Sequence, residues 1–242
     1  MNITEHWRPT TTLRTGLVWL LSADIVTTVA FGFALNHQQT VVDHYNHGAA
    51  SYSSTQSASS LLGMVAIAYL VLLLATAAVF IVWQWRSAKN NEVLGRIRPR
   101  YTPGWSIGGW FIPLANLVIP VRIMQDLWQG SDPEIRNYRD PRSLPKWSLI
   151  GWWWGCTIGA RFLAATIIGQ GLIIVSGVLA IVMVRRITDR QEAVRFSGVR
   201  NEAGWYTDPT ARFDHRYWDG MRWTDHVSKS GQVANDPIVE IG

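Results

Sequence analysis

The sequence has 242 residues, of which 48% are apolar and only 16% are charged, whereas a soluble domain usually carries about 25% charged residues. From Asn46 to Trp85 there is no Lys, Arg, Asp or Glu, so this stretch could not form the surface of a soluble domain. The single cysteine, Cys156, excludes an intramolecular disulfide framework and a cysteine-based zinc site. The net charge of +5 does not indicate nucleic-acid binding, because the basic excess lies beside apolar stretches and the segment after Val184 is neutral.

Four apolar stretches are long enough to cross a bilayer, which takes about 20 residues. They are residues 13–35, 60–85, 147–165 and 167–186. The sequence leaves open whether the turn between the last two lies near Arg161 or near Gly169–Gly171. A weak cleavage-site pattern at Gly32–Ala34 suggests a signal peptide. The stretch before it is long and interrupted by Asp24, however, which favours an uncleaved first helix.

A fifth apolar stretch, residues 104–124, contains Pro113 and Pro120, which interrupt a regular helix. Basic residues cluster on both sides of this stretch and beside the first and last spans, whereas residues 36–59 contain no Lys or Arg. Loops rich in Lys and Arg mark the cytoplasmic side of a membrane protein. The two basic clusters that flank residues 104–124 can both be cytoplasmic only if this segment enters and leaves the bilayer on that side. We therefore predict an all-α multi-pass bundle of the cell membrane with four crossings, one re-entrant or interfacial segment and both termini in the cytoplasm. A fifth full crossing is the alternative.

The re-entrant stretch carries a distinctive motif, PGWSIGGWFIPLANLVIP. It resembles the signature of an uncharacterised family of actinobacterial multi-pass membrane proteins, classed as a domain of unknown function, and the likeness covers roughly residues 13–190. The resemblance implies a membrane fold but no activity. Broken helices at membrane depth line substrate sites in transporters, and the alternative is a structural hairpin whose free backbone groups are capped by neighbours. The motif residues concerned are Pro103, Gly104, Trp105, Trp110, Pro113, Asn116 and Pro120.

Three glycines of the third predicted span, Gly151, Gly155 and Gly159, are spaced four residues apart and share one helical face. Small residues at this spacing let a second helix approach closely. That helix belongs either to the same bundle, which is the default expectation, or to another copy in a homo-oligomer.

The C-terminal part predicts a small β-hairpin-rich module over residues 203–227, after a charged linker, residues 191–202, that could extend the last helix. A hairpin turn is indicated by Asp219-Gly220 and a further turn by Asp208-Pro209. The module resembles a second domain of unknown function, often attached to actinobacterial membrane proteins. We expect its rings to form a miniature aromatic core or to bind a peptide, and residues 228–242 to be disordered. Its characteristic residues are Trp205, Tyr206, Asp208, Pro209, Tyr217, Trp218, Asp219, Gly220 and Trp223.

Two ionisable residues, Asp24 and Arg161, lie at membrane depth within the predicted spans. Charges in hydrocarbon are costly and usually have a partner or line a cavity. At about 1.5 Å per residue both lie at comparable heights above the cytoplasmic side, so we predict an intramembrane charge pair. A proton or ion path is the alternative, as is an arginine that extends to the outer surface.

The sequence has no phosphate-binding loop, zinc-binding helix or nucleophile elbow, so we expect neither an enzyme nor a cofactor. Histidines and Asp43 in residues 37–47 could ligate a metal, but their irregular spacing favours a solvated loop, and no metal site is predicted. We predict a non-enzymatic scaffold or regulatory protein of the cell envelope, whose partners are the lipid bilayer and a cytoplasmic protein or peptide. A small transporter or channel component is the alternative, and a membrane enzyme using Asp126, Asp132 and Glu134 ranks third.

Overall fold

The computed structural model describes residues 6–95, 97–132, 146–163, 166–201, 203–208, 210, 212–219 and 223–237. The chain divides into two compact units, Asn2–Gln191 and Glu192–Gly242. The first unit is helical, and the second contains a small antiparallel sheet. The predicted combination of apolar helices with a C-terminal β module is therefore confirmed.

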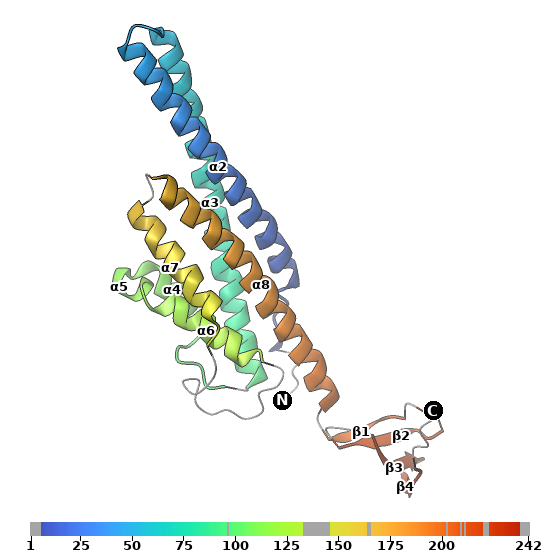
Figure 1. The fold of residues 1–242 in the computed structure, drawn as a ribbon. Coiled ribbons are helices and arrows are strands. Elements are labelled where there is room, and N and C mark those ends of the chain that lie inside the picture. The colour runs from blue at the N-terminus through green and yellow to red at the C-terminus, as the bar shows by residue number, and fades with distance from the viewer. Residues whose placement is uncertain are drawn as a thin grey trace. The chain divides into compact units, whose positions relative to one another are not determined.

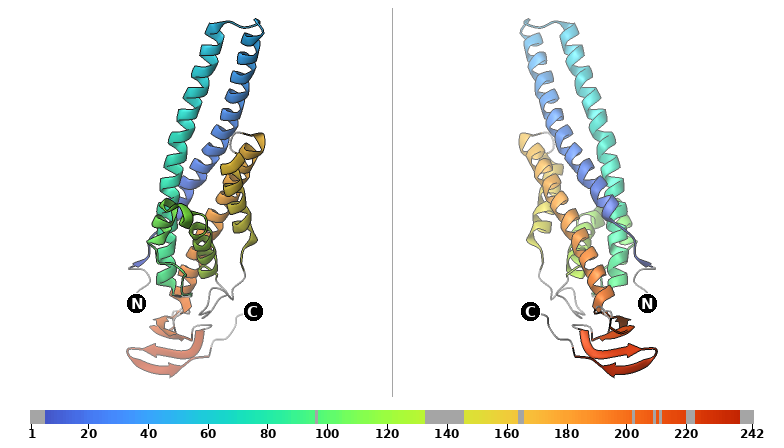
Figure 2. Two further views of the ribbon diagram at one scale, coloured as in Figure 1. Left: turned by 90° about the vertical axis from the view of Figure 1, so that its left-hand side faces the viewer. Right: turned by 90° about the vertical axis from the view of Figure 1, so that its right-hand side faces the viewer.

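Seven helices are described, and three of them are long and apolar enough to cross a membrane, namely α2, α3 and α8. The helix α7, with 16 residues, is shorter. α2 and α3 run antiparallel and project beyond the adjoining ends of α7 and α8 (Figures 1 and 2). In chain order the helices are α2 (Thr11–Asn46), α3 (Tyr52–Leu94), α4 (Trp105–Phe111), α5 (Pro113–Asn116), α6 (Ile119–Gly130), α7 (Ser148–Leu163) and α8 (Ile167–Asn201).

The first two helices are longer than their predicted spans, because polar residues extend both of them. The predicted external loop, residues 36–59, is mostly helical. Hydroxyl groups there donate to backbone carbonyls one turn earlier, as Ser57 does to Ser53 (2.9 Å), and neither helical extension contains proline or glycine. Hydropathy locates the part of a helix that lies in the bilayer and not the ends of the helix, which explains the difference.

The turn between the last two predicted spans lies between the end of α7 at Leu163 and the start of α8 at Ile167, and so falls between Arg161 and Gly169–Gly171. Thr157 of α7 and Ser176 of α8 share a hydrogen bond between their hydroxyl groups (2.7 Å). This bond joins the two helices within an otherwise apolar region.

The segment from α4 to α6 is a broken helix that folds back on itself, with α4 packed against α6 (Figure 1). Pro113 and Pro120 each stand in the first turn of a new helix, α5 and α6, where their missing N–H is not needed. Asn116 Nδ2 donates to the Trp110 carbonyl (2.7 Å) and so satisfies a backbone group that the break leaves free. The predicted interruption by proline is thus present at both positions.

The core of the helical unit is built around Phe80 and Trp83 of α3. Phe80 packs against Trp83, Trp110 and Trp153, with ring centroids 5.5, 5.9 and 6.0 Å away. Aromatic pairs at such distances stabilise a core by about 0.5–1.5 kcal/mol each beyond their burial. Aliphatic side chains complete the core, namely Leu17, Leu21, Met124, Leu127, Ile150, Ala180, Met183, Val184 and Ile187.

The C-terminal sheet has four antiparallel strands in sequential order, β1 (Gly204–Thr207), β2 (His215–Trp218), β3 (Trp223–Lys229) and β4 (Gln232–Asn235). α8 continues to Asn201, so the predicted linker is helical for most of its length, as one interpretation of the sequence proposed. The prediction of disorder from residue 228 is wrong, because β3 continues past that point and β4 follows. Ser230 and Gly231 form the turn with φ angles of 51° and 81°, and this Ser-Gly pair was a signal for it.

Candidate functional site

A cavity of about 490 Å³ lies among α2, α3, α4, α7 and α8 of the helical unit. Its walls are mostly apolar and aromatic, and a few polar side chains line it. Small-molecule sites in proteins typically have this size and make-up. The polar and aromatic residues of the cavity are Asp24, Tyr69, Thr76, Phe80, Trp110, Trp153, Thr157, Arg161 and Ser176.

Asp24 lines this cavity from α2, about 20 Å from the start of the helix at 1.5 Å per residue. The residue is only 9% exposed, and its Oδ1 atom has no hydrogen-bond partner. Thr76 lines the same cavity from α3 beside the Asp24 carboxyl, and its buried Oγ1 atom forms no hydrogen bond of good geometry. Buried polar atoms usually have a hydrogen-bond partner. These two oxygen atoms therefore identify the part of the cavity where a hydrogen-bond donor from a ligand would fit.

Arg161 lines the same cavity from α7, but it does not pair with Asp24. Within the described part of the chain, its guanidinium donates to Asn116 Oδ1 (3.4 Å) and lies 5.7 Å from the ring centroid of Trp154. The predicted charge pair is therefore wrong as a direct ion pair, although both charges line one cavity. Helix rise gave their heights but not the direction of the arginine, which the partners on neighbouring elements determine.

The broken segment begins and ends at the same place in the helical unit. The Arg100 amide donates to Asp126 Oδ2 (2.9 Å), and Arg122 Nη1 donates to the Tyr101 hydroxyl (3.2 Å). Burial raises the pKa of the Asp126 carboxyl above its ordinary value, although the Arg100 amide and charge act in the opposite direction. The chain thus leaves this point at Arg100 and returns to it at Asp126.

The motif residues of the broken segment fall into a packed part and an exposed part. The indole of Trp110 donates to Gln84 Oε1 (2.8 Å) and anchors α4 to α3. Around the break, Phe111 and Leu114 are 73% and 80% exposed, as expected for side chains that face lipid. Pro103 and Gly104 precede α4, Trp105 begins it and is 40% exposed, Pro113 and Asn116 belong to α5, and Pro120 is buried in α6.

A buried polar layer, which the sequence analysis missed, joins α3, α6 and α8. Gln191 Nε2 donates to Asn91 Oδ1 (2.8 Å), and Asn91 Nδ2 donates to the Asp126 carbonyl (3.0 Å). Nearby, the indole of Trp83 donates to Thr188 Oγ1 (3.0 Å). Amide side chains at the end of an otherwise apolar helix were the signal that could have revealed this layer.

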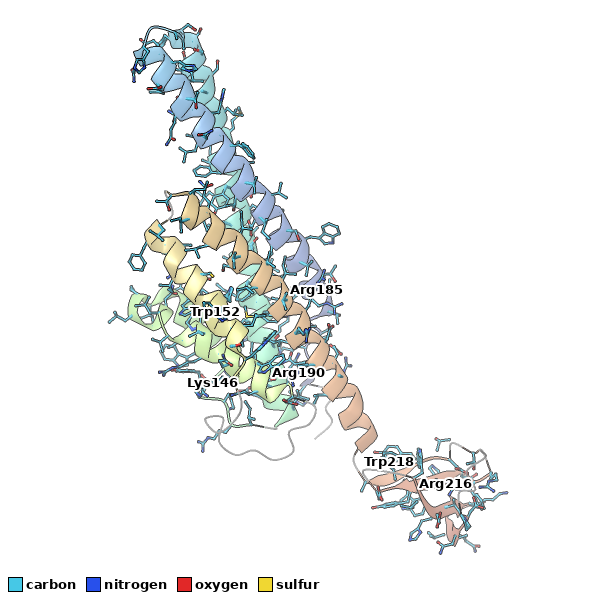
Figure 3. All side chains as sticks on the ribbon, in the orientation of Figure 1. Lys146, Trp152, Arg185, Arg190, Arg216 and Trp218 are labelled. Carbon is cyan, nitrogen blue, oxygen red and sulfur yellow. The ribbon has the colours of Figure 1, made fainter. Side chains whose placement is uncertain are left out.

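The centre of the sheet is a buried charge cluster rather than the predicted aromatic core. Arg216, labelled in Figure 3, is fully buried and donates from Nε to Asp208 Oδ1 (2.9 Å) and from Nη2 to Asp236 Oδ2 (2.5 Å). Its Nη1 donates to the carbonyls of Thr224 and Asp236 (3.0 and 2.8 Å). Burial raises the pKa of the Asp208 carboxyl, but hydrogen bonds from Thr210 and Arg216 outweigh it and hold the pKa well below the ordinary 3.8.

The aromatic rings of the module surround this cluster in edge-to-face pairs. Trp205 contacts Tyr217, and Trp218 contacts Trp223, with centroids 5.4 and 5.3 Å apart. Trp205 is 42% exposed, so this ring is not consumed by a core. Tyr206 packs against Trp223, Asp219 is exposed after β2, and Pro209 and Gly220 lie outside the described residues.

The three-glycine face of α7 packs against another helix at one position. A Cβ on Gly159 would lie 3.1 Å from Leu172 of α8, whereas Gly151 and Gly155 have open space there. Packing within the described chain therefore accounts for Gly159 but not for Gly151 or Gly155.

The histidine-rich end of α2 shows no metal-binding arrangement. Asp43 Oδ1 and His47 Nδ1 lie 3.5 Å apart, and both side chains are exposed. Across the residues with a described placement, no group of three or more His, Cys, Asp or Glu side chains could hold a metal ion.

Two family models match the chain. Residues 46–170 match a domain of unknown function, DUF4328. The chain belongs to the DUF4328 family. The DUF4328 match is shorter than the expected likeness over residues 13–190, and it includes Thr76 and Arg161 but not Asp24. Residues 203–236 match a protein of unknown function, DUF2510, and so include all four strands. No curated protein and no solved structure matches the chain.

Proposed function

We propose that this is a non-enzymatic integral membrane protein with a regulatory or scaffolding role, whose C-terminal sheet binds a cytoplasmic protein or peptide. The observation that carries the proposal is the exposed ring of Trp205, which contacts the ring of Tyr217 edge-to-face. Because the Arg216 cluster fills the centre of the sheet, this ring pair remains available for binding. Small modules use exposed aromatic side chains in this way to bind extended peptides.

The binding proposal is tested by crosslinking the full-length protein in its native membrane and identifying the neighbours. The variant Trp205→Ala should lose a neighbour that the wild type captures, while the sheet keeps its resistance to protease. Val233→Ala, at a 64% exposed position of β4, is the matched control and should capture the same neighbours as the wild type. Identical neighbours for all three proteins would contradict the proposal.

The topology that we propose has four crossings, with α7 as the fourth, a re-entrant segment from α4 to α6, and both termini in the cytoplasm. The hydrogen bond between Arg100 and Asp126 supports a segment that returns to its starting side. Lys146 and Arg190 lie near the same end of the helical unit, and Arg185 lies farther along α8, level with Trp152 (Figure 3). The positions of Lys146 and Arg190 agree with a single cytoplasmic side.

Cysteine labelling in intact cells tests this topology, in a background in which Cys156 is replaced by alanine. Lys146→Cys should react only after the membrane is permeabilised, and Ser53→Cys should react from outside; both positions are exposed. Labelling of Lys146→Cys from outside would show that the segment from α4 to α6 crosses fully.

Transport is the second candidate function, and the cavity that contains both Asp24 and Arg161 favours it. Flux measured in proteoliposomes, compared with empty vesicles, separates the two functions. A transporter would show flux that Asp24→Asn abolishes, whereas a scaffold would show none.

A further inference from the structure

The carboxylate of Asp24 has no counter-ion within the described chain. Arg161, which lines the same cavity, is directed to Asn116 and Trp154, and no described basic side chain forms an ion pair with Asp24. An unpaired carboxylate at membrane depth is unfavourable. Within the described part of the chain, the cavity therefore contains an acceptor that a cation from outside the protein could pair with.

The surroundings of Asp24 suit an organic cation. The Thr76 hydroxyl lies beside the Asp24 carboxyl and adds a second oxygen, and the rings of Phe80, Trp110 and Trp153 line the same cavity. Aromatic faces attract ammonium groups, so the rings and the carboxylate favour the same charge. A calcium ion would instead need six to eight oxygen ligands, and the cavity's hydroxyls of Thr157 and Ser176 are bonded to each other.

The rest of the cavity suits an apolar body. Leu21, Leu73 and Ile173 line it together with the rings, and the volume of about 490 Å³ is within the range of small-molecule sites. We propose that this cavity binds an amphipathic primary amine, with the ammonium group at Asp24 and Thr76 and the apolar part against the aromatic and aliphatic walls. The proposal does not depend on the role of the C-terminal sheet.

Three probes that differ only in their head group test the proposal, namely octylammonium, octanol and octanoate. The full-length protein is placed in phosphatidylcholine nanodiscs, and calorimetric binding is corrected with empty nanodiscs, which account for partition into lipid. At pH 7 the amine is charged, since its pKa resembles that of lysine at about 10.4. The wild type should bind octylammonium more tightly than octanol, and octanoate most weakly.

Variants assign the binding to the cavity. Asp24→Asn should weaken octylammonium binding on the order of ten- to a hundredfold, because it removes a hydrogen bond to a charged group, and it should leave octanol binding unchanged. Thr76→Val, which has nearly the same shape, should weaken it by a smaller factor. Asp43→Asn, on the same helix but outside the cavity, is the matched control and should bind like the wild type.

Two results would overturn the proposal. One is equal octylammonium binding by the wild type and Asp24→Asn. The other is tighter binding of octanoate that Arg161→Gln abolishes, which would make the cavity an anion site. Thermal unfolding of each variant verifies its folding, and if Asp24→Asn does not fold, the order of the three probes on the wild type and Thr76→Val decides.

Discussion

Replacing Arg216 with methionine should unfold the C-terminal sheet while the helical unit stays intact. Arg216 is fully buried and bonded to Asp208, to Asp236 and to the Thr224 carbonyl. Removing one partner of a buried ion pair costs about 3–5 kcal/mol, because the remaining charges stay buried without compensation. Here Asp208 loses its cationic partner and Asp236 keeps only Arg212, and units of this size rarely have more than about 3–5 kcal/mol of stability.

Limited proteolysis of the full-length protein in nanodiscs measures this effect. The variant should be cut within residues 203–236, and the helical unit should remain as a resistant fragment. Arg212→Met is the matched control, since Arg212 also pairs with Asp236 (2.8 Å) but its side chain is 48% exposed. Exposed pairs stabilise by at most about 1 kcal/mol, so this control should stay resistant.

Equal resistance of Arg216→Met and the wild type would refute this reasoning. The aromatic rings would then hold the sheet, as the sequence alone suggested, and Trp218→Ala would be the variant that unfolds it. Equal sensitivity of both arginine variants would show instead that exposure does not set the strength of these pairs.

Three further predictions concern the sheet, the broken helix and the polar layer. The pKa of Asp208 is lower in the folded sheet than its ordinary 3.8. The stability that Asp208 contributes is therefore present above pH 3.8 and is lost as the pH falls below 3.8. Asp208→Asn should flatten this acid dependence, measured as protease resistance of the sheet. Gly109→Ala should cost about 1–3 kcal/mol in thermal unfolding, since its Cβ would lie 2.7 Å from Ile119, whereas Gly108→Ala, with open space, should not destabilise. Asn91→Leu should cost about 1–3 kcal/mol by leaving buried amide partners unsatisfied, and a smaller loss would show that water replaces them.

The apolar helices and the break between α4 and α6 could be predicted because their causes are local in the sequence. The length of an apolar stretch and the two prolines of residues 104–124 each act on a short part of the chain. The polar extensions of α2 and α3 could not be predicted from hydropathy, because nothing in the membrane argument limits a helix that continues into water. The turn at Ser230-Gly231 was predictable from its residue types, and only the expectation of a disordered tail hid it.

The positions of the site residues could be predicted from the sequence, but the contacts between them could not. The sequence identified Asp24 and Arg161 as the charges at membrane depth, and the structure brings both to one cavity. The sequence could not show that the Arg161 guanidinium donates to Asn116 of the broken segment and does not pair with Asp24. The partner of Arg161 depends on where a distant element packs. The spacing of residues along one helix carries no information about that packing.

Arg216 and Asp24 are both buried ionisable residues, but they differ in their partners. This difference indicates a structural role for Arg216 and a binding role for Asp24. The partners of Arg216 all lie within the sheet, so neutralising it should destabilise the fold. Asp24 lines a cavity with one carboxylate oxygen unsatisfied, so neutralising it removes an uncompensated charge from the bilayer. Asp24→Asn should therefore unfold thermally at the same temperature as the wild type or a higher one, measured in nanodiscs without added amine. A clear loss of stability would show that the folded chain already compensates this carboxylate, and the cavity would then need no ligand to do so.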